Sequence, residues 1–186
     1  MTNGWLARRF PDLFASPLAF VVGGFAPDIG LALMTAGAAV FFPLARDMSL
    51  SESMSYAFDT LFFESRPWIA AANILHSPVV VAALYLIATR TRVGSIPPVW
   101  RGRLASFAAG CALHIVMDIP VHHDDGPVVF WPLDWSYRIE SPVSYWDPDH
   151  FGAYVAPVDL AITVIGGAAL ALSVWRGRRP RPQAEG

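Results

Sequence analysis

Residues 114–135 read HIVMDIPVHHDDGPVVFWPLDW and hold three of the five histidines of the chain. The preceding residues, 104–113, are almost wholly apolar. A group of potential metal-binding side chains therefore comes immediately after a hydrophobic segment. His114 and Asp118 lie four residues apart. On a helix this spacing places both side chains on one face, with Cβ atoms roughly 5–6 Å apart. An imidazole nitrogen and a carboxylate oxygen can then bind one cation at about 2.0–2.2 Å.

The spacing of His114 and Asp118 also has a simpler interpretation, a histidine at a helix end paired with a carboxylate. The crowding of His122, His123 and Asp124 just beyond favours a metal site instead. These three residues are candidates for further metal ligands or for the general base of a metal-dependent reaction. Pro120 leaves the helical register of residues 122 and 123 open.

The composition indicates a membrane protein. Of 186 residues, 54% are hydrophobic and only 15% are charged, against about 25% charged residues in soluble domains. This length predicts one domain, which we place at residues 1–175. All thirteen basic residues are arginine, and they form no basic helix, so we expect no nucleic-acid partner. The single cysteine, Cys111, lies inside an apolar run and is expected to be a packing residue.

Four apolar segments predict an all-α membrane bundle with four transmembrane helices, because each is close to the length that crosses a bilayer. Residues 46–66 between the first two segments have apolar side chains at helical spacing, which predicts a short amphipathic helix on the membrane surface. Residues 120–154 form an acidic, aromatic outer loop, and residues 176–186 form a basic tail that we expect to be disordered. The predicted spans are residues 17–43, 68–89, 104–119 and 155–175.

The first segment contains Pro27 and Asp28 near its middle, between glycines. Proline lacks a backbone donor and disfavours helix at the preceding residue, so we expect a kinked or broken helix at Pro27-Asp28. A carboxylate at that depth costs about 2.5–3.5 kcal/mol unless it is paired or hydrated, which suggests a functional Asp28. The alternative is a turn in which Asp28 caps the second half of the helix. His76 lies eight residues inside the second segment.

Arginine placement predicts the topology. Ten of the thirteen arginines lie in residues 1–9, 90–103 and 176–181, whereas residues 46–66 and 120–154 hold three arginines beside ten acids. With four spans these two sets fall on opposite sides of the membrane, and the arginine-rich side, with both termini, is expected to be cytoplasmic. Every histidine then lies on the outer side or in the outer half of the membrane.

With these motifs in place, the chain resembles a bacterial family of LexA-regulated, inner-membrane-associated metal-dependent hydrolases. Pro27-Asp28 resembles the family's early PD motif, and His76-Ser77 resembles its HS motif. The block from His114 and Asp118 through Gly126 to the sequence FWP at residues 130–132 is the most specific match. Two positions depart from the family. Gly30 stands where a second acid is frequent, and residues 71–75 lack the family's His-Arg-Gly and threonine.

Together the topology and the resemblance predict a divalent metal held by Asp28, His76, His114 and Asp118. Two nitrogen and two oxygen ligands suit zinc, our first choice, and also manganese or iron. The resemblance implies a multi-pass protein of the bacterial inner membrane that hydrolyses an ester by metal-activated water, and we expect a lipid phosphoester or a periplasmic ester as substrate. Two alternatives remain at this stage: a non-catalytic membrane protein with a structural metal or a partner-binding site, and a small transporter with Asp28 and His76 on an ion path.

Overall fold

The computed structural model describes residues 15–90 and 96–177, so most of the predicted basic tail lies outside the described residues. The described part of the chain is helical, with no strand and one isolated antiparallel bridge between Val128 and Arg138. Two helical stretches in it, Ala26–Arg46 and Pro98–Val121, are long and apolar enough to cross a membrane. The helices Arg66–Asn73 and Pro78–Arg90 are joined by a bend, and this pair would give a third crossing if the two together form one span. The prediction of a helical fold with helices that could span a membrane is therefore confirmed, and the number of four spans stays a prediction.

The first apolar segment is broken, as expected, but the break lies just ahead of Pro27. Helix α2 (Pro17–Gly23) ends before Gly24, and helix α3 (Ala26–Arg46) begins two residues later. Pro27 occupies the first turn of α3, where a backbone N–H has no partner within the helix, so the proline disrupts nothing there. Asp28 lies in the same turn, where the helix dipole stabilises a negative charge.

The amphipathic stretch after α3 folds back on it in three short helical pieces. They are α4 (Leu50–Ser55), the π-helical turn η2 (Tyr56–Leu61) and α5 (Phe62–Glu64). Ser49 and Glu52 start α4 with reciprocal side-chain-to-backbone hydrogen bonds. A small core of Ala38, Ala57 and Trp68 then joins α3 to this stretch and to the next helix.

The second apolar segment is not one straight helix. Helices α6 (Arg66–Asn73) and α7 (Pro78–Arg90) are bent by 49° relative to each other around residues 74–77. Pro78 explains the bend, because its ring disfavours helical geometry at Ser77. Helix α8 (Pro98–Asp118) continues into a 3₁₀ turn, η3 (Ile119–Val121). A second 3₁₀ turn, η4 (Pro148–His150), precedes the last helix, α9 (Gly152–Gly177).

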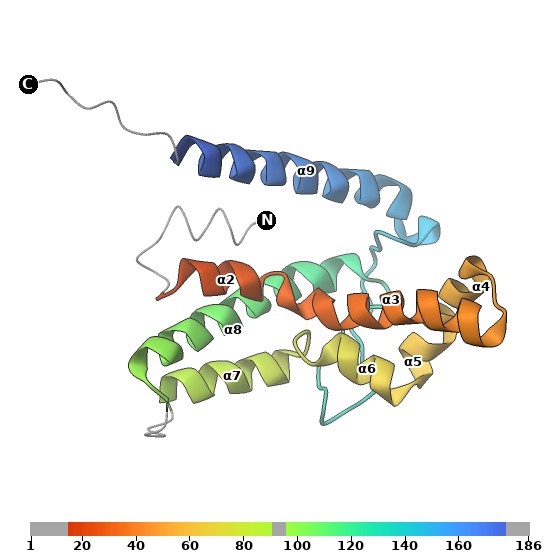
Figure 1. Ribbon diagram of the computed structural model, residues 1–186, viewed down its shortest axis with the longest axis horizontal. Coiled ribbons are helices and arrows are strands. Elements are labelled where there is room, and N and C mark those ends of the chain that lie inside the picture. Colours follow the sequence, from red (N-terminus) through yellow and green to blue (C-terminus); the bar gives the residue numbers. More distant parts are fainter. Residues whose placement is uncertain (1–14, 91–95, 178–186) are drawn as a thin grey trace, which may run out of the picture.

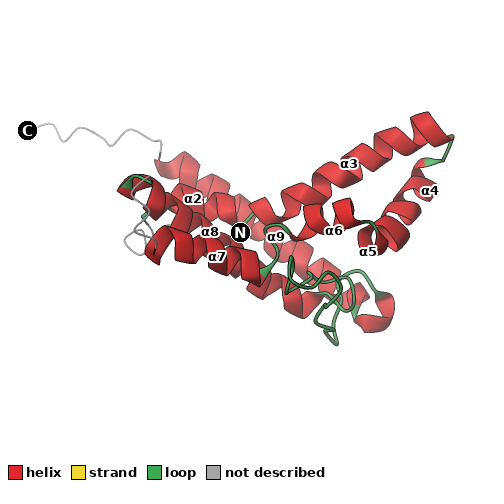
Figure 2. Ribbon diagram, turned by 90° about the horizontal axis from the view of Figure 1, so that it is seen from below, coloured by secondary structure: helices red, strands yellow, loops and turns green. Residues whose placement is uncertain are grey.

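Figure 1 shows that α2, α3 and α8 run in one direction along the molecule, whereas α6, α7 and α9 run in the other. Helix α8 packs between α2 and α7 around a core of Val81, Ala108, Cys111 and Ile115. In Figure 2, α3 and the segment from α4 to α6 extend away from this three-helix packet as a second arm. The junction between the packet and the arm lies at the start of α3, the bend between α6 and α7, and the end of α8.

Two glycines bring α2 and α8 into backbone contact near this junction. A Cβ atom added to Gly23 would lie 2.1 Å from the carbonyl oxygen of Phe107, and one added to Gly110 would lie 2.1 Å from the carbonyl oxygen of Phe20. No other residue type fits such a crossing without separating the helices. This close approach sets where the preceding and following turns, including Asp28 and His114, can meet.

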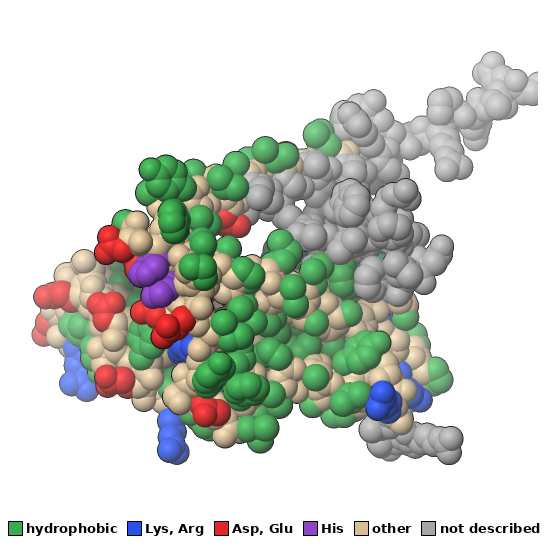
Figure 3. Space-filling model, turned by 180° about the vertical axis from the view of Figure 1, so that it is seen from behind, with side chains coloured by type: hydrophobic (Ala, Val, Ile, Leu, Met, Phe, Trp, Pro, Cys, Tyr) green, Lys and Arg blue, Asp and Glu red, His purple; other side chains and the backbone are tan. Residues whose placement is uncertain are grey.

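The surface has the character of a membrane protein. Large apolar side chains of α3 point outward at helical spacing, which suits contact with lipid: Ile29, Leu33, Val40, Phe41 and Leu44. In Figure 3, hydrophobic side chains cover the middle of the described face, whereas acidic and histidine side chains gather towards one end. The polar end therefore contrasts with an apolar body that water alone would not stabilise.

Candidate metal centre

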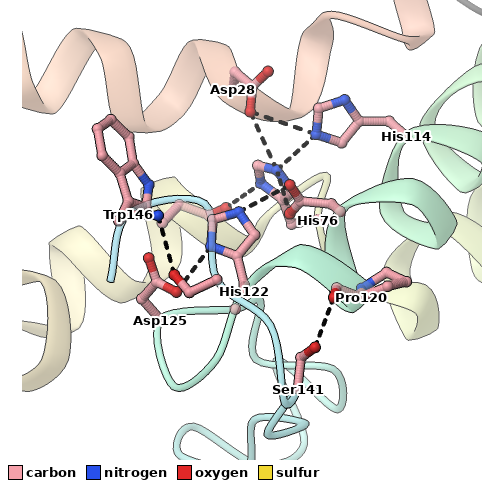
Figure 4. Close-up of polar contacts among 12 residues, drawn as sticks. Asp28, His76, His114, Pro120, His122, Asp125, Ser141 and Trp146 are labelled. Carbon is pink, nitrogen blue, oxygen red and sulfur yellow. Dashed lines mark hydrogen bonds and ion pairs between the residues drawn. The ribbon is translucent and has the colours of Figure 1, made fainter. Parts of the chain in front are cut away.

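Three separate elements each contribute one residue to a cluster of metal-ligand side chains. Asp28 lies in the first turn of α3, His76 in the bend between α6 and α7, and His114 on the last turns of α8. Figure 4 shows the three side chains pointing toward one another from these elements. Their ligand atoms lie within 4.8 Å of one another, and no other group of three such residues in the described part of the chain does so.

The distances within the cluster are short. The Nε2 atoms of His76 and His114 lie 3.1 Å apart. Asp28 Oδ1 is 3.4 Å from each of these two nitrogens. Asp118, the fourth predicted ligand, places its Oδ2 atom 3.8 Å from His76 Nε2.

Backbone contacts fix which nitrogen of each imidazole faces the cluster. His76 Nδ1 lies 2.7 Å from the carbonyl oxygen of Ala72, and His114 Nδ1 lies 3.0 Å from that of Gly24. A carbonyl only accepts hydrogen bonds, so both Nδ1 atoms donate. In the neutral rings the two Nε2 atoms then carry lone pairs that point at each other and at a carboxylate. A cation among them removes this repulsion, and a hydrogen bond from the second ring nitrogen is the usual support of a metal-bound histidine.

The spacing also matches the size of a metal site. For bond lengths of 2.0–2.1 Å and tetrahedral angles, neighbouring ligand atoms lie about 3.3 Å apart. The contacts of 3.1 and 3.4 Å among Asp28, His76 and His114 lie close to this value. Asp118, at 3.8 Å from His76 Nε2, lies somewhat farther than this value. The residues therefore fit a divalent ion.

Asp118 is tied to a second set of charged groups. His122 Nε2 lies 3.0 Å from Asp118 Oδ1, and His122 Nδ1 lies 2.9 Å from Asp125 Oδ1. Burial by itself lowers the pKa of His122, but its hydrogen bonds to the two carboxylates outweigh this effect and raise the pKa to about 9. His122 uses both nitrogens as donors, so it orients Asp118.

A small cavity of about 70 Å³ adjoins the cluster. The side chain of Asp28 is 63% exposed, so the site is open on the α3 side, whereas His76 is buried. An ion held here would keep room for water or for a substrate atom. The polar residues that line the cavity are Asp28, Asn73, His76, Asp118, His122, Asp125, Arg138 and Tyr145.

The structure does not bring His123 and Asp124 to this cavity. His123 stacks on His150 with ring centroids 3.5 Å apart, and its Nδ1 atom donates to the carbonyl oxygen of Ser141. Asp124 is exposed. Of the three predicted candidates for the general base, only His122 lines the cavity.

Four polar residues of the cavity were not singled out from the sequence. Asp125 has a sequence signal, because it lies three residues after His122 and pairs with it. For Asn73, Arg138 and Tyr145, no sequence pattern distinguishes a residue of the site from an ordinary structural residue. Tyr145 packs edge-on against His122, and burial is the main effect that raises its pKa to about 12.

Asn73 and Ser77 attach the outer loop to the bend that carries His76. The Asn73 side-chain oxygen accepts from the backbone N–H of Val128 at 2.6 Å. The Ser77 hydroxyl donates to the carbonyl oxygen of Trp131 at 2.5 Å. Both side chains are fully buried. The HS motif and the FWP motif thus share a structural role: the hydrogen bond between Ser77 and Trp131 holds the outer loop against the bend that carries His76.

Gly30, one of the departures from the family pattern, has a structural reason in this chain. A Cβ atom added to Gly30 would lie 1.9 Å from the carbonyl oxygen of Ala71, because α3 and α6 cross in contact. An acidic side chain at residue 30 has no room here.

No protein-family model, curated protein or solved structure matches this chain. The likeness to the hydrolase family consequently rests on the motifs quoted above.

Proposed function

We propose that the protein is a membrane-bound, metal-dependent hydrolase whose substrate is an ester, first of all a lipid phosphoester. One observation carries the proposal: two histidine Nε2 atoms and an aspartate oxygen converge at 3.1–3.4 Å beside an open cavity. The motifs shared with the hydrolase family supply the same residues. We further propose four spans in the bacterial inner membrane, with the site towards the outer face and both termini in the cytoplasm.

Asp28, His76, His114 and Asp118 would hold the ion, with zinc as first choice and manganese or iron as alternatives. Such an ion would supply Lewis-acid activation of water and of the ester oxygen. Hydrolysis of a phosphoester forms a bond from the water oxygen to phosphorus and breaks the bond from phosphorus to the alcohol oxygen. One proton of the water ends on the alcohol, and the other leaves with the phosphate product or the solvent.

The protein's own residues give this reaction its orientation. His122 holds Asp118 through Oδ1, which leaves Oδ2 directed towards His76. His76 and His114 are held by backbone carbonyls, so their Nε2 atoms keep one direction. We assign His122 the role of a positioning residue, because both of its nitrogens are engaged by carboxylates.

A non-catalytic metal protein is the main alternative. A structural site surrounds its ion with protein ligands, whereas Asp28 leaves this cluster open. The exposed apolar surface of α3 and the aromatic loop, with Trp146 69% exposed, favour a substrate that is itself part of the membrane.

The test is hydrolysis by protein purified in detergent and loaded with zinc or manganese. We expect phosphate release from phosphatidic acid, or release of the phosphorylated head-group alcohol from a short-chain phosphodiester lipid. Either release should be lost with a chelator and recovered on adding the metal back. Asp28→Asn keeps the size of the side chain but removes its charge, and it should lower turnover at least about tenfold. Metal bound in stoichiometric amount without hydrolysis of phosphate or carboxylate esters would favour the non-catalytic alternative.

A further inference from the structure

The outer loop places one arginine at the cavity wall. Arg138 is the only arginine among the described residues that line the cavity, and the chain contains no lysine. It lies in the loop segment paired with residue 128, 110 positions along the chain from Asp28. Only the fold therefore brings Arg138 to the cavity that Asp28 and His76 also line.

The guanidinium is held firmly but not neutralised by a direct partner. It lies over the rings of Phe62 and Phe63, at 4.7 and 5.2 Å from their centroids, and Nη1 donates to the carbonyl oxygen of Gly126. Within the described residues no carboxylate forms an ion pair with it. Burial is the largest effect on the pKa of Arg138 and lowers it, against the opposing charges of Asp125 and Asp124.

A guanidinium has five N–H donors in a planar fork, and the Gly126 carbonyl takes one of its nitrogens. An arginine that only braced a loop would gain more from a paired carboxylate, and Asp125 stands in the same cavity without pairing with it. The fork geometry suits two oxygens of one phosphoryl group.

Charge in the cavity also calls for a cation beyond the metal. Three carboxylates line the cavity, from Asp28, Asp118 and Asp125, and the protonated His122 offsets only one of their charges, so the cavity still repels an anionic substrate. A phosphoester brings at least one negative charge of its own. A neutral carboxylate ester would need no such cation.

We propose that Arg138 binds the non-bridging oxygens of a phosphoryl group while the metal-ligand cluster holds the opposite side of the same group. The site thus selects phosphoesters over carboxylate esters. This inference rests on the proposed metal site, and it names the substrate class that the site accepts. The cavity of about 70 Å³ has the size for such a group together with an ion, so the remainder of the substrate lies outside it.

The test measures binding of inorganic phosphate, so it does not depend on turnover. Purified protein loaded with Mn²⁺ shortens the ³¹P relaxation time of phosphate that binds beside the ion. Arg138→Gln should retain its Mn²⁺ but bind phosphate about 10- to 100-fold more weakly, the effect of losing hydrogen bonds to a charged group. Arg138→Lys keeps the positive charge but not the planar pair of donors, so its phosphate affinity should lie between those of wild type and Arg138→Gln.

Arg66→Gln is the matched control. Arg66 also lies over an aromatic ring, that of Trp135 at 5.8 Å, and on the same predicted side of the membrane, but it does not line the cavity. Its substitution should leave phosphate binding unchanged.

Equal phosphate affinity in wild type and Arg138→Gln would overturn the inference, and so would loss of Mn²⁺ from that variant, which would make Arg138 a support of the metal site. Competition by acetate as effective as by phosphate would overturn the assignment to a phosphoryl group. If Arg138→Gln does not yield folded protein, Arg138→Lys serves instead. Phosphate affinity equal to that of wild type in Arg138→Lys would then overturn the inference. Phosphate binding that depends on Arg138 in a protein that hydrolyses no ester would remove the hydrolase proposal alone.

Discussion

The Nε2 atoms of His76 and His114 lie 3.1 Å apart although each ring already donates its Nδ1 hydrogen to a backbone carbonyl. Two neutral imidazoles in this state present lone pairs to each other, which is unfavourable. Either a proton or a metal ion relieves the conflict. Asp28 Oδ1, 3.4 Å from both nitrogens, supplies the third ligand atom that a metal ion needs.

Metal content tests this relationship directly. Loss of a residue that only supports a metal ligand lowers metal affinity about 10- to 100-fold. We expect His76→Ala and His114→Ala each to lower metal affinity by more than this. The double variant should be little worse than either single one, because ligands of one ion act as a unit. Asp118→Ala should weaken binding less, since its oxygen is the most distant at 3.8 Å. Stoichiometry is measured by plasma mass spectrometry on folded, detergent-purified protein.

His123→Ala is the control for that experiment, because His123 stacks on His150 away from the cluster. It should keep wild-type metal content. Equal metal in wild type and His114→Ala would refute the site and the hydrolase proposal with it.

The crossing of α3 and α6 gives a prediction about stability. Gly30→Ala forces a methyl group against the carbonyl of Ala71, so it should destabilise the protein by about 1–3 kcal/mol as overpacking does. Gly37→Ala lies on the same helix with nothing within 4 Å of the new Cβ atom, and it should be neutral or stabilise by about 0.5–1 kcal/mol. Thermal unfolding in detergent compares the two. Similar melting temperatures would show that the helices do not cross in contact.

The attachment of the outer loop gives a third prediction. Asn73→Ala leaves the buried N–H of Val128 without its acceptor, which should cost about 1–3 kcal/mol. Ser77→Ala removes the donor to the carbonyl of Trp131 and should have an effect in the same direction. Limited proteolysis should then cut the loop, residues 122–147, faster than in wild type. Thr89→Ala, which removes an exposed hydroxyl on α7, should leave the cleavage rate unchanged.

The arginine asymmetry gives a prediction about topology. Alkaline phosphatase fused after Asp125 should be active, because residues 120–154 are expected outside the cytoplasm, whereas a fusion after Gly94 should be inactive. The reverse pattern of activity would invert the proposed orientation.

The sequence by itself determined the helical, membrane-type character of the chain. Length and hydropathy of the apolar segments are local properties, and they predicted the helices and the break near Pro27. The bend ahead of Pro78 was not predicted, and the second segment was expected to be one span. The break ahead of Pro27 shifted by a few residues, because proline is tolerated in the first turn of a helix. The four residues of the candidate metal site were also singled out from the sequence, since His114 and Asp118 share one helical face and Asp28 and His76 are polar residues inside apolar runs.

Only the tertiary structure decided which of these residues meet. His76 and His114 are 38 positions apart in the sequence, and His114 reaches the carbonyl of Gly24 across 90 positions. Local propensity carries no information about such contacts. They follow from the backbone crossings at Gly23, Gly110 and Gly30, where a missing side chain allows two helices to touch. The same packing leaves His123 and Asp124 outside the cavity and brings Asp125 and Arg138 into it, because the loop is held by Asn73 and Ser77 rather than by its own sequence pattern.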